Sequence, residues 1–309
     1  MKRIAVLILV MLLALGCTAT PISGVVQWGA GGGTDTLMRP LCALAEQQLD
    51  RTITMRNMTG GTGTVATQYV YDKAADGDTL LLGAENPALY DALSLSDLTY
   101  ADFDCILLVG CESVGIVVQG DSPYATIDAL LAAAKAQPDT IRLATTGKGG
   151  LPWTVASFLE QVTGVRFLQV PYDSDATART AVQNGECDVT VCKVQAAIDA
   201  HQDGTLRFLC MFTDAPVDGL SDVPPITEYD ATFAKFLPWG PFYGVFVKKG
   251  VDSSKRETLT NGFLAAFLDD SYQALLKELH IEPLGLSGKA AAEYIQNWRE
   301  SSLSALQGD

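Results

Sequence analysis

The sequence predicts an α/β fold made of two similar units, and three observations support this. The chain has 309 residues, which is long enough for two domains. Short apolar segments alternate with segments of helical periodicity, as in parallel strands joined by helices. A glycine-rich loop follows the first predicted strand of each unit, at 29–33 and at 146–150. Because ligands bind at this end of the strands in open α/β sheets, each unit offers half of a binding site.

The first unit begins with a strand predicted at 25–30, followed by the glycine loop and an amphipathic helix at 34–49. Its remaining elements are a strand at 53–57, a loop at 59–63, a helix at 64–75 and a strand at 79–83.

The second unit repeats the pattern, and Pro152 opens a helix at a first-turn position where its missing N–H costs nothing. Strands are predicted at 141–145, 166–170, 187–191 and 206–212, with helices at 127–136, 175–184 and 194–200. The tail from Ser253 is predicted to be largely helical.

The N-terminus has the pattern of an export signal. Lys2 and Arg3 precede an apolar run over 4–15 that is too short to span a bilayer. The run ends in Gly16-Cys17, as in lipoproteins; an ordinary signal before a buried cysteine is the alternative. We therefore expect a signal peptide over 1–16, lipid on Cys17 and a tether over 17–23. The mature protein would be anchored at the outer face of the cell membrane or in the periplasm.

Composition and missing motifs exclude several functions. The formal net charge of −15 disfavours nucleic acid, because phosphate contacts need clustered Lys and Arg. A dinucleotide fingerprint fails at Thr34, where its third glycine belongs. No G-x-S-x-G elbow is present, and His201 and His280 fall at predicted helix ends. With no general base to nominate, we expect neither an enzyme nor a cofactor.

Seven cysteines leave the disulfide question open. Six remain if Cys17 carries lipid, and an even number outside the cell permits disulfides. We favour buried thiols, since a chain of this length does not need covalent links. No C-x-x-C occurs, so no metal site is expected.

The loop over 29–33 is the strongest local signal. Its glycines let the backbone approach a ligand, and the following helix offers free N–H groups and a partial positive charge. We expect Thr34 to cap this helix, and Asp35 to pair with Arg39 four residues on. The alternative is an ordinary glycine turn and helix cap. In the second unit, Lys148 and Lys193 follow predicted strand ends, where side chains reach a cleft.

An ordered set of segments resembles the solute-binding proteins of tripartite tricarboxylate transporters. The matching segments are 29–39, Asn57 to Thr64, the Asp-Gly-Asp-Thr-Leu turn over 76–80, the Val-Pro-Tyr step over 170–172, 185–188, and the Asp-Val-Pro step from 222. No single segment is specific, but their order across the chain is. The sequence departs from the family at Trp28, Pro152, Trp153, Cys192 and Lys193.

The resemblance implies a type II periplasmic-binding-protein clamshell, each lobe a mainly parallel sheet flanked by helices. We place lobe 1 at 24–118 plus 229–309 and lobe 2 at 119–228, with crossings near 119 and 229. The candidate ligand-binding residues are Trp28, Ala30, Gly31, Gly32, Gly33, Thr34, Asp35, Asn86, Thr145, Thr146, Gly147, Lys148, Gly149, Trp153, Tyr172 and Lys193.

The resemblance also implies a function. An exported receptor would capture a small carboxylate, such as a di- or tricarboxylate, by hinge closure and deliver it to integral-membrane transporter subunits. We expect it to act as a monomer. A sensor feeding a signalling partner, or an enzyme on the same scaffold, are the alternatives. Neighbouring genes for two membrane subunits would favour transport, and a neighbouring kinase gene would favour sensing.

Overall fold

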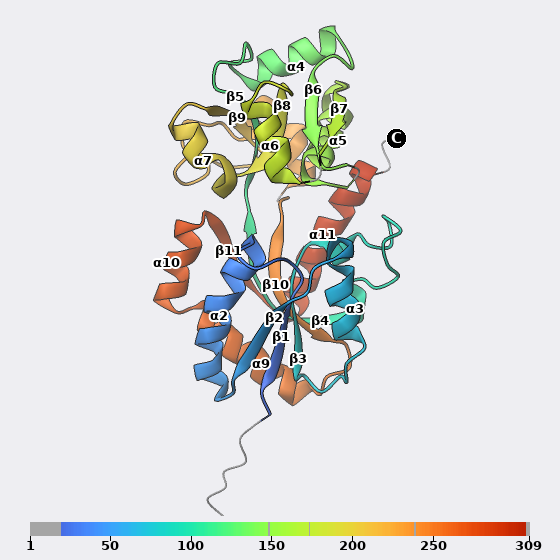
Figure 1. Ribbon diagram of the computed structural model, residues 1–309, viewed down its shortest axis with the longest axis vertical. Helices are drawn as coiled ribbons and strands as arrows, with labels where there is room; N and C mark the ends of the chain where they lie inside the picture. The colour runs from blue at the N-terminus through green and yellow to red at the C-terminus, as the bar shows by residue number, and fades with distance from the viewer. Residues whose placement is uncertain (1–19, 148, 173, 238, 307–309) are drawn as a thin grey trace, which may run out of the picture.

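The computed structural model describes residues 20–147, 149–172, 174–237 and 239–306. Two lobes lie one above the other along its longest axis, each built around one sheet (Figure 1). The predicted signal peptide, Cys17 and Lys148 lie outside the described residues. Within those residues, no helix is both long and apolar enough to cross a bilayer.

The first lobe holds a six-stranded sheet of order β11-β4-β10-β3-β1-β2. Its strands are β1 (Ile22–Val26), β2 (Ile53–Asn57), β3 (Thr79–Ala84), β4 (Phe103–Glu112), β10 (Phe242–Lys248) and β11 (Ile281–Leu286). Its helices are α2 (Gly33–Leu49), α3 (Thr64–Tyr71), α9 (Ser253–Phe267), α10 (Asp270–Glu278) and α11 (Gly288–Leu306). Short 3-10 turns lie at η1 (Gly61–Gly63), η2 (Asn86–Ala88) and η3 (Tyr100–Asp102).

The second lobe holds a five-stranded sheet of order β7-β6-β8-β5-β9. Its strands are β5 (Val114–Gln119), β6 (Arg142–Thr145), β7 (Leu168–Pro171), β8 (Val189–Lys193) and β9 (Leu206–Met211). Its helices are α4 (Ile127–Ala136), α5 (Leu151–Thr163), α6 (Asp175–Gln183) and α7 (Val194–Gln202). The segment leading back to the first lobe carries α8 (Ile226–Tyr229) and the 3-10 helix η4 (Ala231–Phe236).

Successive strand residues pack on opposite faces of the first sheet. Val26 and Leu82 join a buried cluster with α2, α9 and α10, whereas Val25 and Leu81 join another with α3 and α11. The two clusters bury both faces of the sheet. This agrees with the nearly continuous apolar sequence of its central strands, which is typical of a sheet covered on both faces. The two-lobed α/β fold predicted from the sequence is confirmed.

The predicted strand pairing needs correction, because both sheets are mixed. β1 pairs in parallel with β2 and β3, but β10 is antiparallel to β3 and β4. In the second sheet β6 is parallel to β7 and β8, and β5 is antiparallel to β8 and β9. Two of the antiparallel strands, β10 and β5, enter their lobe directly from the other lobe, whereas β11, which is antiparallel to β4, follows α10 within the first lobe.

The chain changes sheets at points that differ from the predicted crossings. β4 ends at Glu112 and β5 begins at Val114, so the first crossing is at Ser113 and not near 119. The return lies between η4 and β10, later than 229. The two crossings touch: the Glu112 amide donates to the Pro241 carbonyl at 2.8 Å. A Cβ on Gly240 would lie 2.1 Å from the Glu112 carbonyl oxygen, so only glycine fits there.

Helix α11 starts in the first lobe and ends against the second (Figure 1). The Trp298 indole donates to the Gly240 carbonyl at 2.8 Å, and its ring stacks on Trp239. The Trp239 indole donates in turn to the buried Ser302 hydroxyl at 2.8 Å. Near the helix end, Gln161 of α5 donates to the Ser304 carbonyl at 2.6 Å. α11 therefore joins both lobes to the second crossing.

The six cysteines from Cys42 to Cys210 are free thiols in the described chain. Burial raises the pKa of Cys42 and of Cys192, in each case to about 12. These side chains act as small apolar groups in the core.

Candidate functional site

The glycine loop after β1 is held in shape by the Asp35 carboxylate. This carboxylate accepts hydrogen bonds from the Gly31 amide and the Arg39 guanidinium, each at 2.9 Å, and from the Asn57 side chain at 2.9 Å. The Arg39 bond is the main reason that the pKa of Asp35 falls to about 2, against the opposing effect of burial. The predicted Asp35–Arg39 pair is confirmed. Because the protein's own donors occupy Asp35, we assign it to shaping the loop, not to contacting a ligand.

The N-terminus of α2 leaves backbone donors open beside this loop. Gly32 is the N-cap and no side chain caps the helix, so the prediction that Thr34 caps it is wrong. The Thr36 amide makes the first bond, to the Gly32 carbonyl at 2.9 Å. The amides of 33–35 therefore have no acceptor within the described chain, and the positive end of the helix dipole lies with them.

Thr34 differs from the other buried polar side chains. It is 2% exposed, and its hydroxyl makes no hydrogen bond to any described residue. The other buried polar side chains, including Gln27, Glu112 and Ser302, each have a partner. The fully buried side-chain oxygens that lack a partner among the described residues are those of Asn86 and Tyr294, so the Thr34 hydroxyl keeps some access to solvent. It is therefore open to a hydrogen bond with water or with a bound molecule.

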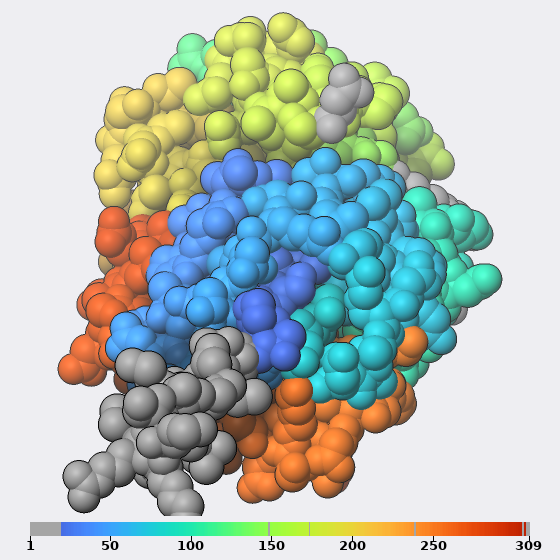
Figure 2. Space-filling model, turned by 60° about the horizontal axis from the view of Figure 1, so that its bottom comes forward, coloured from blue at the N-terminus to red at the C-terminus, as the bar shows by residue number. Residues whose placement is uncertain are grey.

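The second-lobe loop faces the first lobe. The Gly147 amide donates to the Thr145 hydroxyl at 3.2 Å, and the Gly150 amide to the Gly147 carbonyl at 3.0 Å. Gly149 has a φ of +80°, and a Cβ there would lie 3.0 Å from the Leu93 side chain of the first lobe. The lobes therefore touch at this loop, and Figure 2 shows the N-terminal part of the first lobe packed against the second along a seam.

Three side chains from both lobes meet at the hinge. Lys193, at the end of β8, lies 2.8 Å from the Glu112 carboxylate, at the end of β4. The Tyr243 hydroxyl donates to Glu112 at 2.7 Å and accepts from Lys193 at 3.2 Å. A Cβ on Gly33 would lie 2.9 Å from this hydroxyl, so the group lies against the N-terminus of α2. We call Glu112, Lys193 and Tyr243 the hinge triad.

The hinge triad changes how Lys193 is interpreted. Burial acts to lower its pKa, but Tyr243, Glu112 and Glu85 outweigh burial and raise it well above the usual value. Lys193 thus stays charged, as the sequence analysis assumed. Its charge is already paired with Glu112, however, so it is not a free cation for a ligand.

Two further carboxylates lie within electrostatic range of the triad. Burial raises the pKa of Glu85 to about 7; Glu112 and Asp175 add to this effect and Lys193 opposes it. Asp175, the first residue of α6, is exposed as a residue, but desolvation of its carboxylate raises its pKa, with Glu112 adding and Lys193 and the Thr146 hydroxyl opposing. Glu85 follows Ala84, whose strand partner is Tyr243. The space around the triad is therefore acidic.

The other predicted site residues are spread more widely. Trp28 is half-buried, and its carbonyl accepts from Asn57 at 2.8 Å. Trp153 is 7% exposed and packs in the large core cluster. The Tyr172 hydroxyl lies 3.4 Å from Cys187, which raises its pKa to about 12. Asn86 begins η2, and its side-chain oxygen is buried without a hydrogen bond to any described residue.

Of the predicted site residues, the structure thus places Lys193 in the triad, Gly33 against it and Trp153 in the core. Sequence reasoning missed Glu85, Glu112, Tyr243 and Asp175. A usable signal existed for Glu85, which follows a correctly predicted strand two residues beyond its predicted end.

Comparison with known families identifies the family of this chain. The sequence pattern of the tripartite tricarboxylate transporter family receptor matches residues 37–305. The chain belongs to this family. As a family receptor it is a solute-binding protein, and the family is not one of enzymes.

Relatives of the receptor cover most of its length. Protein BugT of Bordetella pertussis is 26% identical over 238 residues, which is 76% of this chain and 72% of that protein. Among solved structures, a solute-binding protein from Polaromonas without ligand has a TM-score of 0.78 at 23% identity, covering 93% of this chain and 97% of the other. A Rhodopseudomonas palustris protein solved with malate has a TM-score of 0.73 at 21% identity, covering 93% and 99%. These structures show the same fold.

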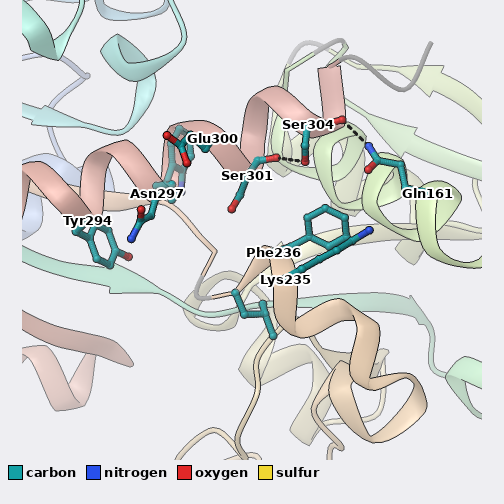
Figure 3. Close-up of a pocket in the computed structure, with 10 residues that line it drawn as sticks. Gln161, Lys235, Phe236, Tyr294, Asn297, Glu300, Ser301 and Ser304 are labelled. Carbon is teal, nitrogen blue, oxygen red and sulfur yellow. Dashed lines mark hydrogen bonds between the residues drawn. The ribbon is translucent and has the colours of Figure 1, made fainter.

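The receptor has a groove on another surface. The groove, of about 480 Å³, lies between α11, α5 and η4, lined by Tyr294, Asn297, Ser301 and Lys235 among others (Figure 3). It contains neither glycine loop. The open amides of 33–35 and the Thr34 hydroxyl lie instead at the start of α2, beside the first-lobe glycine loop. No cluster of metal-binding side chains occurs among the described residues.

Proposed function

We propose that the receptor captures a small organic carboxylate between its lobes and delivers it to the membrane subunits of a tripartite tricarboxylate transporter. The observation that carries this proposal is the N-terminus of α2, where the amides of 33–35 and the Thr34 hydroxyl make no hydrogen bond to a described residue. Open amides with a positive dipole suit an anion. The touching loop of the second lobe supplies the other wall.

Solved structures of similar fold support a carboxylate as the ligand. One was solved with malate, and another from R. palustris, with a TM-score of 0.78 at 20% identity, was solved with adipate. Both ligands are dicarboxylates. Their carboxylate chemistry agrees with the open donors of α2.

Delivery would depend on the closed shape. Rotation about the crossings at Ser113 and before β10 would bury the ligand and form a surface that the membrane subunits recognise. The family is periplasmic, so the protein is exported. Lipid on Cys17 remains a prediction; mass spectrometry of the native N-terminus that finds an unmodified Cys17 would contradict it.

The Thr34 hydroxyl provides the direct test. Thr34→Val keeps the side-chain shape and removes the hydroxyl, so a bound carboxylate would lose one hydrogen bond. We expect affinity for malate, adipate or a related acid to fall about tenfold or more in titration calorimetry. Thr52→Val, at an exposed threonine before β2, serves as the control and should bind normally. Equal affinity in both variants would move the ligand away from α2.

A further inference from the structure

The groove between α11, α5 and η4 is bounded by both lobes. α5 belongs to the second lobe, α11 starts in the first, and η4 lies on the segment that leads from one to the other. Across this boundary, Gln161 of α5 donates to the Ser304 carbonyl of α11 at 2.6 Å. Rotation of the lobes about their crossings moves α5 relative to the start of α11, so the shape of the groove depends on the angle between the lobes.

The groove has an apolar floor and polar walls. Phe236 is 3% exposed and Trp298 4%, and both line it. Tyr294, Asn297 and Ser301 point from α11 into the space between α11 and η4 (Figure 3). The Asn297 amide and the Ser301 hydroxyl make no hydrogen bond to any residue in the described chain. Amides and hydroxyls suit the N–H and C=O groups of an extended polypeptide.

The groove also carries a cation without an anionic partner. Lys235 is exposed, its ammonium lies 4.6 Å from the centre of the Phe236 ring, and it forms no ion pair with a described residue. Glu300, the carboxylate among the residues that line the groove, accepts from Gln296 on the same helix at 2.8 Å. In a chain with a formal net charge of −15, the Lys235 ammonium offers a local point of attraction for an acidic side chain of a partner.

Resting on the proposed function, we propose that this groove is the surface by which the membrane subunits recognise the closed receptor. The occupant is an extended segment of a membrane subunit, whose acidic side chain pairs with Lys235 and whose backbone bonds Asn297 and Ser301. Neither glycine loop lines the groove, so the captured acid stays enclosed while the segment binds. Because both lobes bound the groove, the segment binds more tightly at one lobe angle, and the transporter thereby distinguishes a loaded receptor from an empty one.

Variants of the groove separate docking from ligand binding. Asn297→Trp places a large ring in the groove, and Lys235→Glu replaces the cation with an anion. In cells that carry the membrane subunits and only the variant receptor, each should lower uptake of labelled malate or adipate about tenfold or more. Each should still bind the same acid with wild-type affinity in titration calorimetry. Ala292→Trp, at an exposed residue of α11 outside the groove, and Lys135→Glu, at an exposed residue of α4, are the matched controls and should leave both uptake and affinity unchanged.

Photo-crosslinking identifies the occupant directly. With p-benzoylphenylalanine in place of Asn297, illumination of intact cells should give an adduct with an integral-membrane protein, identified by mass spectrometry, and more of it when the acid is supplied. The same replacement of Ala292 should give no such adduct. An adduct at position 297 with a second copy of the receptor or with a soluble protein would overturn the inference.

The outcomes keep the inference and the proposed function apart. If either groove variant sustains full uptake, the inference is overturned and the carboxylate receptor stands. If a groove variant loses affinity for the acid in proportion to its loss of uptake, the groove acts through ligand binding and the inference is likewise overturned. If the wild type neither binds a carboxylate nor supports its uptake, the proposed function fails, and the adduct at position 297 alone decides the inference.

Discussion

At the scale of single residues, local spacing predicts local contacts. Asp35 and Arg39 are four apart on α2, and that spacing alone predicted their pair. The bond from Asp35 to the Gly31 amide extends the contact into the loop, so one carboxylate fixes both the helix start and the glycine turn. The shape of the ligand site therefore depends on the charge of Asp35.

We predict that Asp35→Asn lowers the free energy of unfolding by about 2 kcal/mol at pH 7. The pKa of Asp35 is lowered to about 2 in the folded protein, from an ordinary value near 3.8 in the unfolded chain. The charged carboxylate therefore stabilises the fold in full when the pH lies above the unfolded pKa. This stabilisation is lost as the pH falls through the folded pKa. Urea unfolding should thus show the gap between wild type and variant shrinking as pH falls from 5 toward 3. Asp199→Asn, at an exposed residue of α7, should show no gap; a gap independent of pH would contradict the assigned cause.

The hinge triad shows where local reasoning ends. Lys193 was predicted because it follows a strand, but Glu112 and Tyr243 lie 131 residues apart in the sequence. Both belong to strands that the sequence analysis did not predict. No pattern within a short window links them, so the pairing that neutralises Lys193 appears only when the strands are assembled.

At the scale of elements, periodicity identified helices better than strands. The helix predicted at 127–136 is α4, with the same bounds. Strand β1 starts and ends earlier than predicted, and β4, β5, β10 and β11 were not predicted. An apolar run identifies a buried segment but not the direction of its neighbours. That is why the mixed pairing of both sheets could not be inferred.

Helix α11 gives a prediction at this scale. Ser302→Ala leaves the buried Trp239 indole N–H without its acceptor, so we expect the free energy of unfolding to fall by about 1–3 kcal/mol. Denaturant titration measures this. Ser301→Ala removes a neighbouring hydroxyl that bonds to no described residue and should have a much smaller effect. Equal effects would show that the indole bond does not fasten the helix.

At the scale of the whole molecule, two lobes joined by two short crossings predict closure on the ligand. Small-angle scattering should show a smaller radius of gyration once a bound acid is present, and chromatography should recover that acid unchanged. Thr34→Val at the same acid concentration should show less closure, because fewer molecules are occupied. An unchanged radius alongside confirmed tight binding would contradict hinge closure.

The contact between the two crossings has a mechanical consequence. Gly240 lies against the Glu112 carbonyl and Pro241 bonds the Glu112 amide, so the two connections turn about one shared axis. Two separate connections would allow the lobes to move relative to one another in several directions, and a bound ligand would have to restrict all of these motions at an entropic cost. A single shared axis leaves only one rotation for the ligand to restrict. More of the contact energy with the captured molecule is then expressed as affinity.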